Sequence, residues 1–181
     1  AGLLGVGGGI IIVPALYFAF EILNFDPLTI MHLSLGTSLA IIIPTSIMST
    51  KTHMQYDAVD FKLIKSFGLF VAGGVLLGTV FASNLETPRL VLIFSVFAFC
   101  IGLFFIFFRE KIGETPRDIP FKIKSLIGTC IGFISVPLGI GGGSVSVPLM
   151  RLFGYSIQNA IGTSAAIGFV ISVVGATTMS F

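Results

Sequence analysis

Two glycine runs, each followed by a proline, are the residues of this chain whose types and spacing could bind a ligand. Residues 5–14 read GVGGGIIIVP and residues 139–148 read GIGGGSVSVP, with six of the ten positions identical. Three glycines in a row disfavour a helix by about 1 kcal/mol each relative to alanine. A helix that restarts after such a break presents free N–H groups and partial positive charge, which suits an anion. The candidate anion-binding glycines are Gly7, Gly8 and Gly9, and Gly141, Gly142 and Gly143.

A second motif follows each glycine run and supplies hydroxyl groups. Gly36-Thr37-Ser38 recurs as Gly162-Thr163-Ser164. Neutral hydroxyl donors can bind an oxyanion without a buried cation, so we expect them to complete the site. The added candidates are Thr37, Ser38, Thr163, Ser164 and, three residues before the second copy of this motif, Asn159. Two alternatives stay open, because glycines also permit close helix packing and hydroxyls can bond to carbonyls of their own helix.

Composition shows what must position these residues. The chain is 55% hydrophobic and 10% charged, with a mean hydropathy of +1.07, whereas soluble domains are about 25% charged. Lipid is therefore the solvent for much of the surface, and the fold class is all-α, a polytopic transmembrane helical bundle with glycine-broken helices. The predicted membrane segments are Ala1–Phe20, Leu28–Ile47, Ser66–Ser83, Leu90–Phe108, Ser125–Met150 and Ala160–Phe181. The GxxxG pairs Gly74–Gly78 and Gly128–Gly132 indicate helix contacts.

The recurring motifs predict two tandem repeats. Residues 1–110 form the first unit with four membrane segments, residues 111–121 a cytoplasmic linker, and residues 122–181 a second unit with two segments. Four segments per unit would give both copies the same orientation. A re-entrant glycine segment would instead make the number of crossings per unit odd and the repeats inverted, and the charge pattern argues against this alternative. By this symmetry the chain is a fragment, truncated at both ends, of a protein of roughly 250–270 residues with about eight spanning segments.

Lysine and arginine predict the orientation. The connections after the second and fourth segments hold eight of the ten basic residues. The other two, Arg89 and Arg151, fall in connections on the opposite side. The positive-inside rule then makes residues 51–65 and 109–124 cytoplasmic and residues 21–27 external, in a multi-pass protein of the cell (plasma or inner) membrane.

Several function classes are disfavoured by what the sequence lacks. It has no HExxH, GxSxG or P-loop lysine, so we do not expect an enzyme. A net charge of +2 without a basic run gives no reason to expect nucleic acid. Cys100 and Cys130 stand alone, so we expect no metal or cofactor. All eight acidic residues fall in connections, so the sequence lacks the intramembrane carboxylate relay that proton-coupled transporters often use. Whether a proton or a sodium ion couples transport stays open.

The paired GxGGGxxxVP and GTS motifs resemble the TauE/SafE family of sulfite exporters over the whole chain. The resemblance implies a membrane transporter, a secondary carrier or permease, whose substrate is sulfite, an organosulfonate or a related sulfur oxyanion. The residues themselves indicate only a small anion and a lipid bilayer as partners. A passive anion channel and a non-transporting membrane scaffold remain as alternatives.

Overall fold

The computed structural model describes residues 8–107 and 120–179 of the 181-residue chain. Within these residues the fold is entirely helical, as predicted. Seven helices follow one another in the described part of the chain: α1 Gly9–Ile22, α2 Ile30–Met54, α3 Phe61–Ser83, α4 Thr87–Phe107, α5 Phe121–Ser135, α6 Gly143–Leu152 and α7 Ile157–Met179.

Three of the described helices, α2, α3 and α7, are long and apolar enough to cross a membrane. Apolar stretches also fill α1 and Thr87–Leu103 of α4. At 1.5 Å per residue, α1 is about 21 Å long and α6 about 15 Å, less than the roughly 30 Å hydrocarbon core of a bilayer. Many large apolar side chains, such as Leu69, Leu77 and Phe99, point outward. This exposure is expected where lipid surrounds the bundle.

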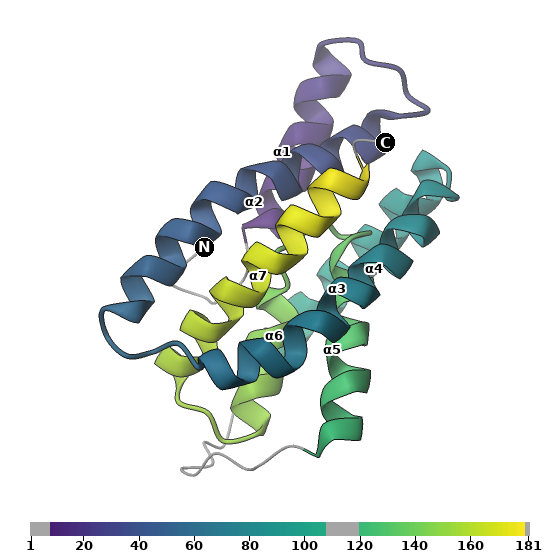
Figure 1. The fold of residues 1–181 in the computed structure, drawn as a ribbon. Coiled ribbons are helices and arrows are strands. Elements are labelled where there is room, and N and C mark those ends of the chain that lie inside the picture. Colours follow the sequence, from purple (N-terminus) through teal and green to yellow (C-terminus); the bar gives the residue numbers. More distant parts are fainter. Residues whose placement is uncertain (1–7, 108–119, 180–181) are drawn as a thin grey trace.

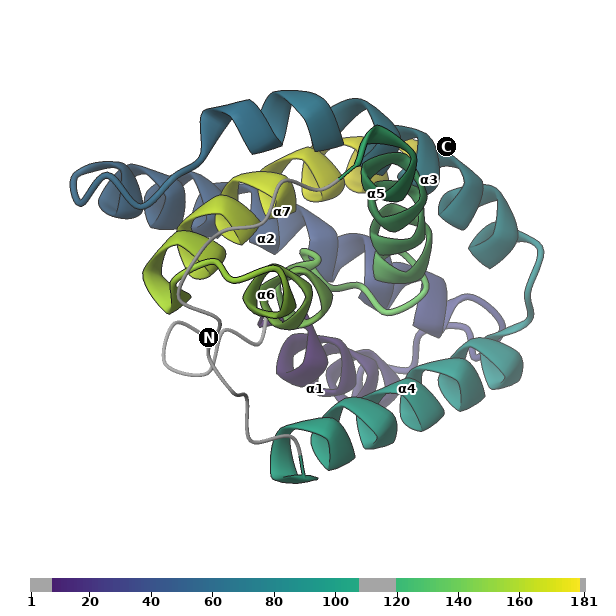
Figure 2. The ribbon, with the colours of Figure 1, turned by 90° about the horizontal axis from the view of Figure 1, so that it is seen from below.

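Helices α2 and α7 lie antiparallel at the centre of the bundle (Figures 1 and 2). Gly36, near the start of α2, contacts Met179 at the end of α7, and Gly162, near the start of α7, contacts His53 at the end of α2. Helix α3 packs beside α7, where the Thr79 and Thr178 hydroxyls are 2.9 Å apart. Helices α2, α7 and α3 therefore pack together to form the centre of the bundle.

The contact between α3 and α5 is made by glycines, which confirms the prediction from the GxxxG pairs. A Cβ atom added to Gly74 would overlap the Thr129 carbonyl, and one added to Gly132 would overlap the Val71 carbonyl. Glycine is required here because the backbones of the two helices are in direct contact, which leaves no room for a side chain. The residue numbers of the contacting pairs rise together along both helices, from Gly74 with Thr129 to Gly78 with Phe133, so α3 and α5 are parallel.

The prediction of one spanning helix over Ser125–Met150 is wrong. Helix α5 ends at Ser135, the chain turns, and α6 starts at Gly143. Because α5 is parallel to α3, it rises from the end of the bundle where α3 begins. Helix α6 returns to that same end, where a short link joins it to the start of α7 (Figure 1). The pair is re-entrant, since Gly139 and Gly142 adopt left-handed backbone conformations (φ +58° and +71°) that reverse the chain.

This re-entrant pair also corrects the predicted orientation of the second unit. Helix α1 leads from its glycine run toward one end of the bundle, and α6 leads from the other run toward the opposite end (Figure 1). The hairpins α1–α2 and α6–α7 are therefore inverted relative to each other and do not share one orientation. The two motif copies differ in direction because α5 and α6 together do not cross the membrane, so one crossing fewer than expected precedes α7.

The inversion moves Arg151 to the other side of the bundle. We call the end formed by the last turn of α2 and the first turns of α3, α5 and α7 the basic end. Of the seven described lysines and arginines, six lie at or near this end and Arg89 lies at the other. The six are Lys51, Lys62, Lys65, Lys122, Lys124 and Arg151. The described charges thus follow the positive-inside pattern more closely than the sequence prediction did.

Candidate functional site

The two glycine runs meet in the interior of the bundle. Gly9, the first residue of α1, packs against the backbone of Gly139 and Ile140, so that an added Cβ atom would overlap both. Val13, one turn further along α1, covers Gly139 from the same side. Gly8 is the N-cap of α1 and Gly142 the N-cap of α6. Gly7 lies outside the described residues. Two helices thus start close to each other and lead away in opposite directions.

The break at the second glycine run is a tight turn between the end of α5 at Ser135 and the start of α6 at Gly143. The Gly139 N–H donates to the Val136 carbonyl at 2.9 Å, and the Ile140 N–H donates to the Ser135 carbonyl at 3.1 Å. The Gly142 carbonyl then accepts the N–H groups of Val145 (3.1 Å) and Ser146 (2.7 Å), which starts the next helix. All backbone positions from Val136 to Gly142 are buried. Buried non-helical backbone at membrane depth is tolerated only inside protein or along a cavity.

Carbonyl groups of this turn face the two central helices. The Ser38 hydroxyl of α2 donates to the Gly139 carbonyl at 2.7 Å. The Gly141 carbonyl packs against Gly168 of α7, where a side chain would not fit. Two carbonyl groups of the turn are thus directed toward α2 and α7, away from the start of α6.

Unpaired donors lie at the first turn of α6. Within the described residues the N–H groups of Gly143 and Ser144 have no hydrogen-bond acceptor, and no side chain caps this helix. Its first turn carries no acidic residue. The hydroxyls of Ser144 and Ser146 are buried and also have no partner in the described part of the chain. A helix start with uncompensated donors and partial positive charge can accept an anion.

The structure divides the predicted hydroxyl residues. Ser38 reaches the break and is already engaged with the Gly139 carbonyl. Thr163 lies near the basic end, where its hydroxyl accepts the Asp60 N–H at 2.9 Å. The Ser164 hydroxyl donates to the Ile161 carbonyl of its own helix at 3.0 Å, which is the back-bonding alternative left open by the sequence. These hydroxyls hold helices in place rather than stand ready for a ligand.

Thr37 and Asn159 lie apart from the break. Thr37 is half-buried in a groove of about 460 Å³ along α2, with His32 and Met179 among its neighbours. Asn159 is in the first turn of α7, where its N–H bonds to the Ser156 hydroxyl at 3.2 Å. The structure therefore brings Ser38 and the glycines together, and it leaves these two outside that group.

Comparison with known proteins decides the family. A sequence model described as "Sulfite exporter TauE/SafE" matches residues 1–181. The chain belongs to the sulfite exporter TauE/SafE family.

Curated relatives of this TauE/SafE chain are longer than it is. A probable membrane transporter protein of Haemophilus influenzae is 29% identical over 175 residues, which cover 97% of this chain and 66% of the relative. The probable membrane transporter protein YunE of Bacillus subtilis is 29% identical over 196 residues, with 97% and 71% covered. One from Methanocaldococcus jannaschii is 24% identical over 186 residues, with 99% and 69% covered. The chain thus spans about two thirds of the length of these relatives. No solved structure matched it.

Membership in the TauE/SafE family and the apolar helices together make the chain a multi-pass membrane protein of a transporter family. The described residues contain no cluster of three or more metal-ligating side chains. The polar groups that the structure brings to the glycine breaks are backbone N–H groups and serine hydroxyls.

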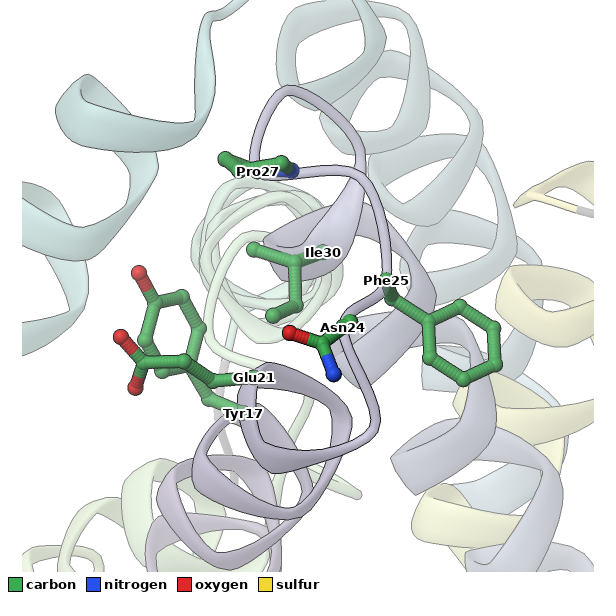
Figure 3. A pocket seen from close by; sticks show the side chains of 6 residues that line it. All are labelled: Tyr17, Glu21, Asn24, Phe25, Pro27 and Ile30. Atoms are coloured by element: carbon green, nitrogen blue, oxygen red, sulfur yellow. The ribbon is translucent and has the colours of Figure 1, made fainter.

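A second hollow, of about 320 Å³, lies at the opposite end of the TauE/SafE bundle from the basic residues, at the α1–α2 connection. Figure 3 shows Tyr17 and Glu21 of α1 on one side of this hollow, with Asn24, Phe25 and Pro27 of the loop around it. The Glu21 carboxylate would repel an anion at this position. This hollow is therefore a poor candidate for the substrate site of an anion transporter.

Ser144 and Ser146 are candidate site residues that the sequence prediction missed. They occupy the second and fourth positions of α6, where the first motif copy has Ile10 and Ile12. The signal was present in the sequence, because hydroxyl residues replace isoleucine at both alternate positions directly after the second glycine run.

Proposed function

We propose that this protein is a secondary transporter for a small anion, and that sulfite, an organosulfonate or a related sulfur oxyanion binds at the glycine breaks. The observation that carries the proposal is the set of unpaired donors at the buried start of α6. The family description names sulfite export, and the relatives are named as probable membrane transporters. Both support the substrate class without assigning it to this chain.

Neutral donors suit a transporter because they bind an anion without holding it too firmly. Within the described residues no lysine or arginine lies at the break, since the seven described cations are near the helix ends. Hydrogen bonds from N–H and O–H groups replace part of the anion's hydration shell, and their modest strength lets the anion leave. This balance is what turnover requires.

The inverted hairpins suggest how access could alternate. Hairpins α1–α2 and α6–α7 run in opposite directions from breaks that touch each other. Inverted repeats with broken helices at their interface are a recurrent plan of secondary transporters, in which one half rocks against the other around a fixed site. In this protein we expect movement of α6–α7 against α1–α2 to open the breaks to each side in turn.

Counterflow in proteoliposomes tests the proposal. Vesicles loaded with unlabelled sulfite should accumulate labelled sulfite transiently, and uptake should saturate with concentration. Thiosulfate and a short alkylsulfonate, each tested in the same way, would define the anion class. Saturable trans-stimulation supports a carrier, whereas flux without trans-stimulation would indicate a channel. No flux of any of the three anions would overturn the proposed function.

A further inference from the structure

The second copy of the GTS motif is a docking surface for the link that joins α2 to α3. Gly162 packs against the Ala58 carbonyl of this link, so that an added Cβ atom would overlap it. Two residues later in the link, the Asp60 N–H donates to the Thr163 hydroxyl at 2.9 Å. Asp60 is also the N-cap of α3, and its carboxylate accepts the Leu63 N–H at 3.0 Å. The motif therefore holds the start of the helix that follows α2.

The first copy of the motif meets the end of α7 in the way that the second copy meets the end of α2. A Cβ atom added to Gly162 would contact the His53 Cβ, and one added to Gly36 would contact the Met179 Cβ. Met179 follows His53 by 126 positions, which is also the interval from Gly36 to Gly162. The two pairs are thus equivalent contacts of an inverted repeat, in which α2 and α7 exchange roles.

Burial distinguishes the two copies of the motif. Both copies read GTSxA, and on α7 the glycine, threonine and alanine are all buried, with Thr163 completely inaccessible. On α2, Gly36 and Thr37 are half-buried and Ala40 is exposed. A Cβ atom added to Gly36 would meet only Met179 among the described residues, and within these residues the Thr37 hydroxyl makes no hydrogen bond. The same three residues therefore meet a covering segment on α7 and an open groove of about 460 Å³ on α2.

We propose that the surface formed by Gly36 and Thr37 is the docking site for the segment that follows α7 in the full-length protein. Five residues after Met179, the backbone of this segment packs against Gly36, in the way that Ala58 packs in the second copy. Seven residues after Met179, an N–H group at the start of the next helix donates to the Thr37 hydroxyl, in the way that Asp60 donates. The two threonines then hold equivalent helix starts at opposite ends of the bundle. This inference does not depend on the identity of the substrate.

Three observations favour this occupant. The end of α7 is already in place, because Met179 lines the groove beside the first turns of α2 (Figure 1). The relatives of this chain are longer than it is, which leaves room for a further link and helix. The groove also offers a glycine and a free hydroxyl acceptor. These groups suit a helix start, whose backbone N–H groups need acceptors at membrane depth.

The first test compares glycine-to-alanine variants of the full-length protein by their unfolding temperatures. Gly36→Ala should lower this temperature, as should Gly162→Ala, because in both the new methyl group would overlap a docked backbone. Gly73→Ala is the matched control, since among the described residues nothing lies within 4 Å of its new Cβ atom. Alanine favours a helix, so this control should not be destabilised. A Gly36→Ala variant at least as stable as Gly73→Ala would overturn the inference.

The second test measures the hydrogen bond to Thr37 in the full-length protein. Thr37→Val should lower the unfolding temperature by about as much as Thr163→Val, because each leaves a buried N–H group without its acceptor. Thr45→Val is the control on the same helix, since Thr45 is exposed and its hydroxyl bonds only to carbonyls of α2. If Thr37→Val is no more destabilised than Thr45→Val, no helix start is bound at Thr37.

Disulfide formation identifies the occupant. In a cysteine-free full-length protein, Thr37→Cys would be paired with a single cysteine at each of the first ten residues after Phe181. Cross-linking should be strongest seven residues after Met179. The reference pair is Asp60→Cys with Thr163→Cys, which the 2.9 Å hydrogen bond brings within disulfide reach. Mass spectrometry of unreduced peptides identifies the linked residues.

Each other outcome of this experiment names a different cover for the groove. A disulfide between two copies of the protein through Thr37→Cys would assign the groove to a second subunit. Labelling of Thr37→Cys by a membrane-impermeant maleimide in intact cells would show a water-filled groove. Absence of any Thr37→Cys cross-link, while the reference pair forms its disulfide, would leave lipid against this surface. Each of these three results would overturn the inference, and none of them would change the result of sulfite counterflow.

Discussion

The Ser38 hydroxyl donates a hydrogen bond to the Gly139 carbonyl at 2.7 Å, across 101 positions of sequence. Ser38 is completely buried on α2, and Gly139 holds the left-handed conformation that begins the second break. This bond ties the hydroxyl motif of the first copy to the glycine run of the second. It satisfies a carbonyl that the turn removes from helical hydrogen bonding and that lies out of reach of water.

Ser38→Ala should destabilise the protein by about 1–3 kcal/mol, because it leaves the buried Gly139 carbonyl without a donor. Thermal unfolding of the detergent-solubilised protein measures the change. Ser34→Ala is the control, since Ser34 is equally buried one turn earlier but bonds only to its own helix. An equal loss of stability in both variants would show that the bond to Gly139 has no special role.

The contact between α3 and α5 gives a second prediction from neighbouring glycines. Gly74→Ala should destabilise the protein by about 1–3 kcal/mol, because the new Cβ atom would overlap the Thr129 carbonyl and push the helices apart. Gly73→Ala places the same methyl group where nothing lies within 4 Å. Helix propensity favours alanine there, so this variant should be neutral or slightly stabilised. Unfolding midpoints that do not separate the two variants would contradict the close contact.

Most of the fold could be predicted from hydropathy, but the ends of the helices could not. The predicted segment Ser66–Ser83 becomes α3 Phe61–Ser83, and Leu28–Ile47 becomes α2 Ile30–Met54. Each extension brings in lysine or other polar residues at the basic end. Helical hydrogen bonding continues past the apolar core into the interface, where long basic side chains can reach water. A hydropathy window detects the apolar core alone.

The re-entrant turn was hidden because apolar residues flank it on both sides. Ser125–Met150 has the length of one spanning helix, and glycine itself does not lower hydropathy enough to mark a reversal. The break was predictable from the glycine run, whereas the reversal depends on positive φ at Gly139 and Gly142. Glycine permits this conformation without requiring it. The first copy shows the difference, since Gly8 is in the right-handed helical region (φ −51°).

The contrast between Gly8 and Gly142 gives a third prediction. Gly142→Ala should impair transport and cost about 1–2 kcal/mol of stability, because a side chain disfavours the left-handed conformation. An added Cβ atom would also lie 2.5 Å from Ile171 Cδ1. Gly8→Ala imposes no such backbone penalty, although both glycines occupy the same motif position. Sulfite counterflow and the unfolding midpoints of both variants provide the measurement. An equal loss of stability in Gly8→Ala and Gly142→Ala would contradict the asymmetry between the two motif copies.

The inverted arrangement makes a prediction about sidedness that the tandem arrangement does not share. Single cysteines would replace Gln55 and Ser156 at the basic end and Asn84 at the opposite end, after Cys100 and Cys130 are changed to alanine. All three positions are exposed. Because the basic end carries six of the seven described cations, it should be cytoplasmic. A membrane-impermeant maleimide applied to intact cells should label Asn84→Cys alone.

Ser156 decides between the two topologies. If Ser125–Met150 crossed the membrane as one helix, the link before α7 would lie on the same side as Asn84, and intact cells would label Ser156→Cys. In the re-entrant structure α5 and α6 start and finish at the basic end, so Ser156→Cys should be labelled only after permeabilisation, together with Gln55→Cys. Labelling of Ser156→Cys together with Asn84→Cys in intact cells would contradict the inversion of α6–α7 and remove the geometric basis for alternating access at the glycine breaks.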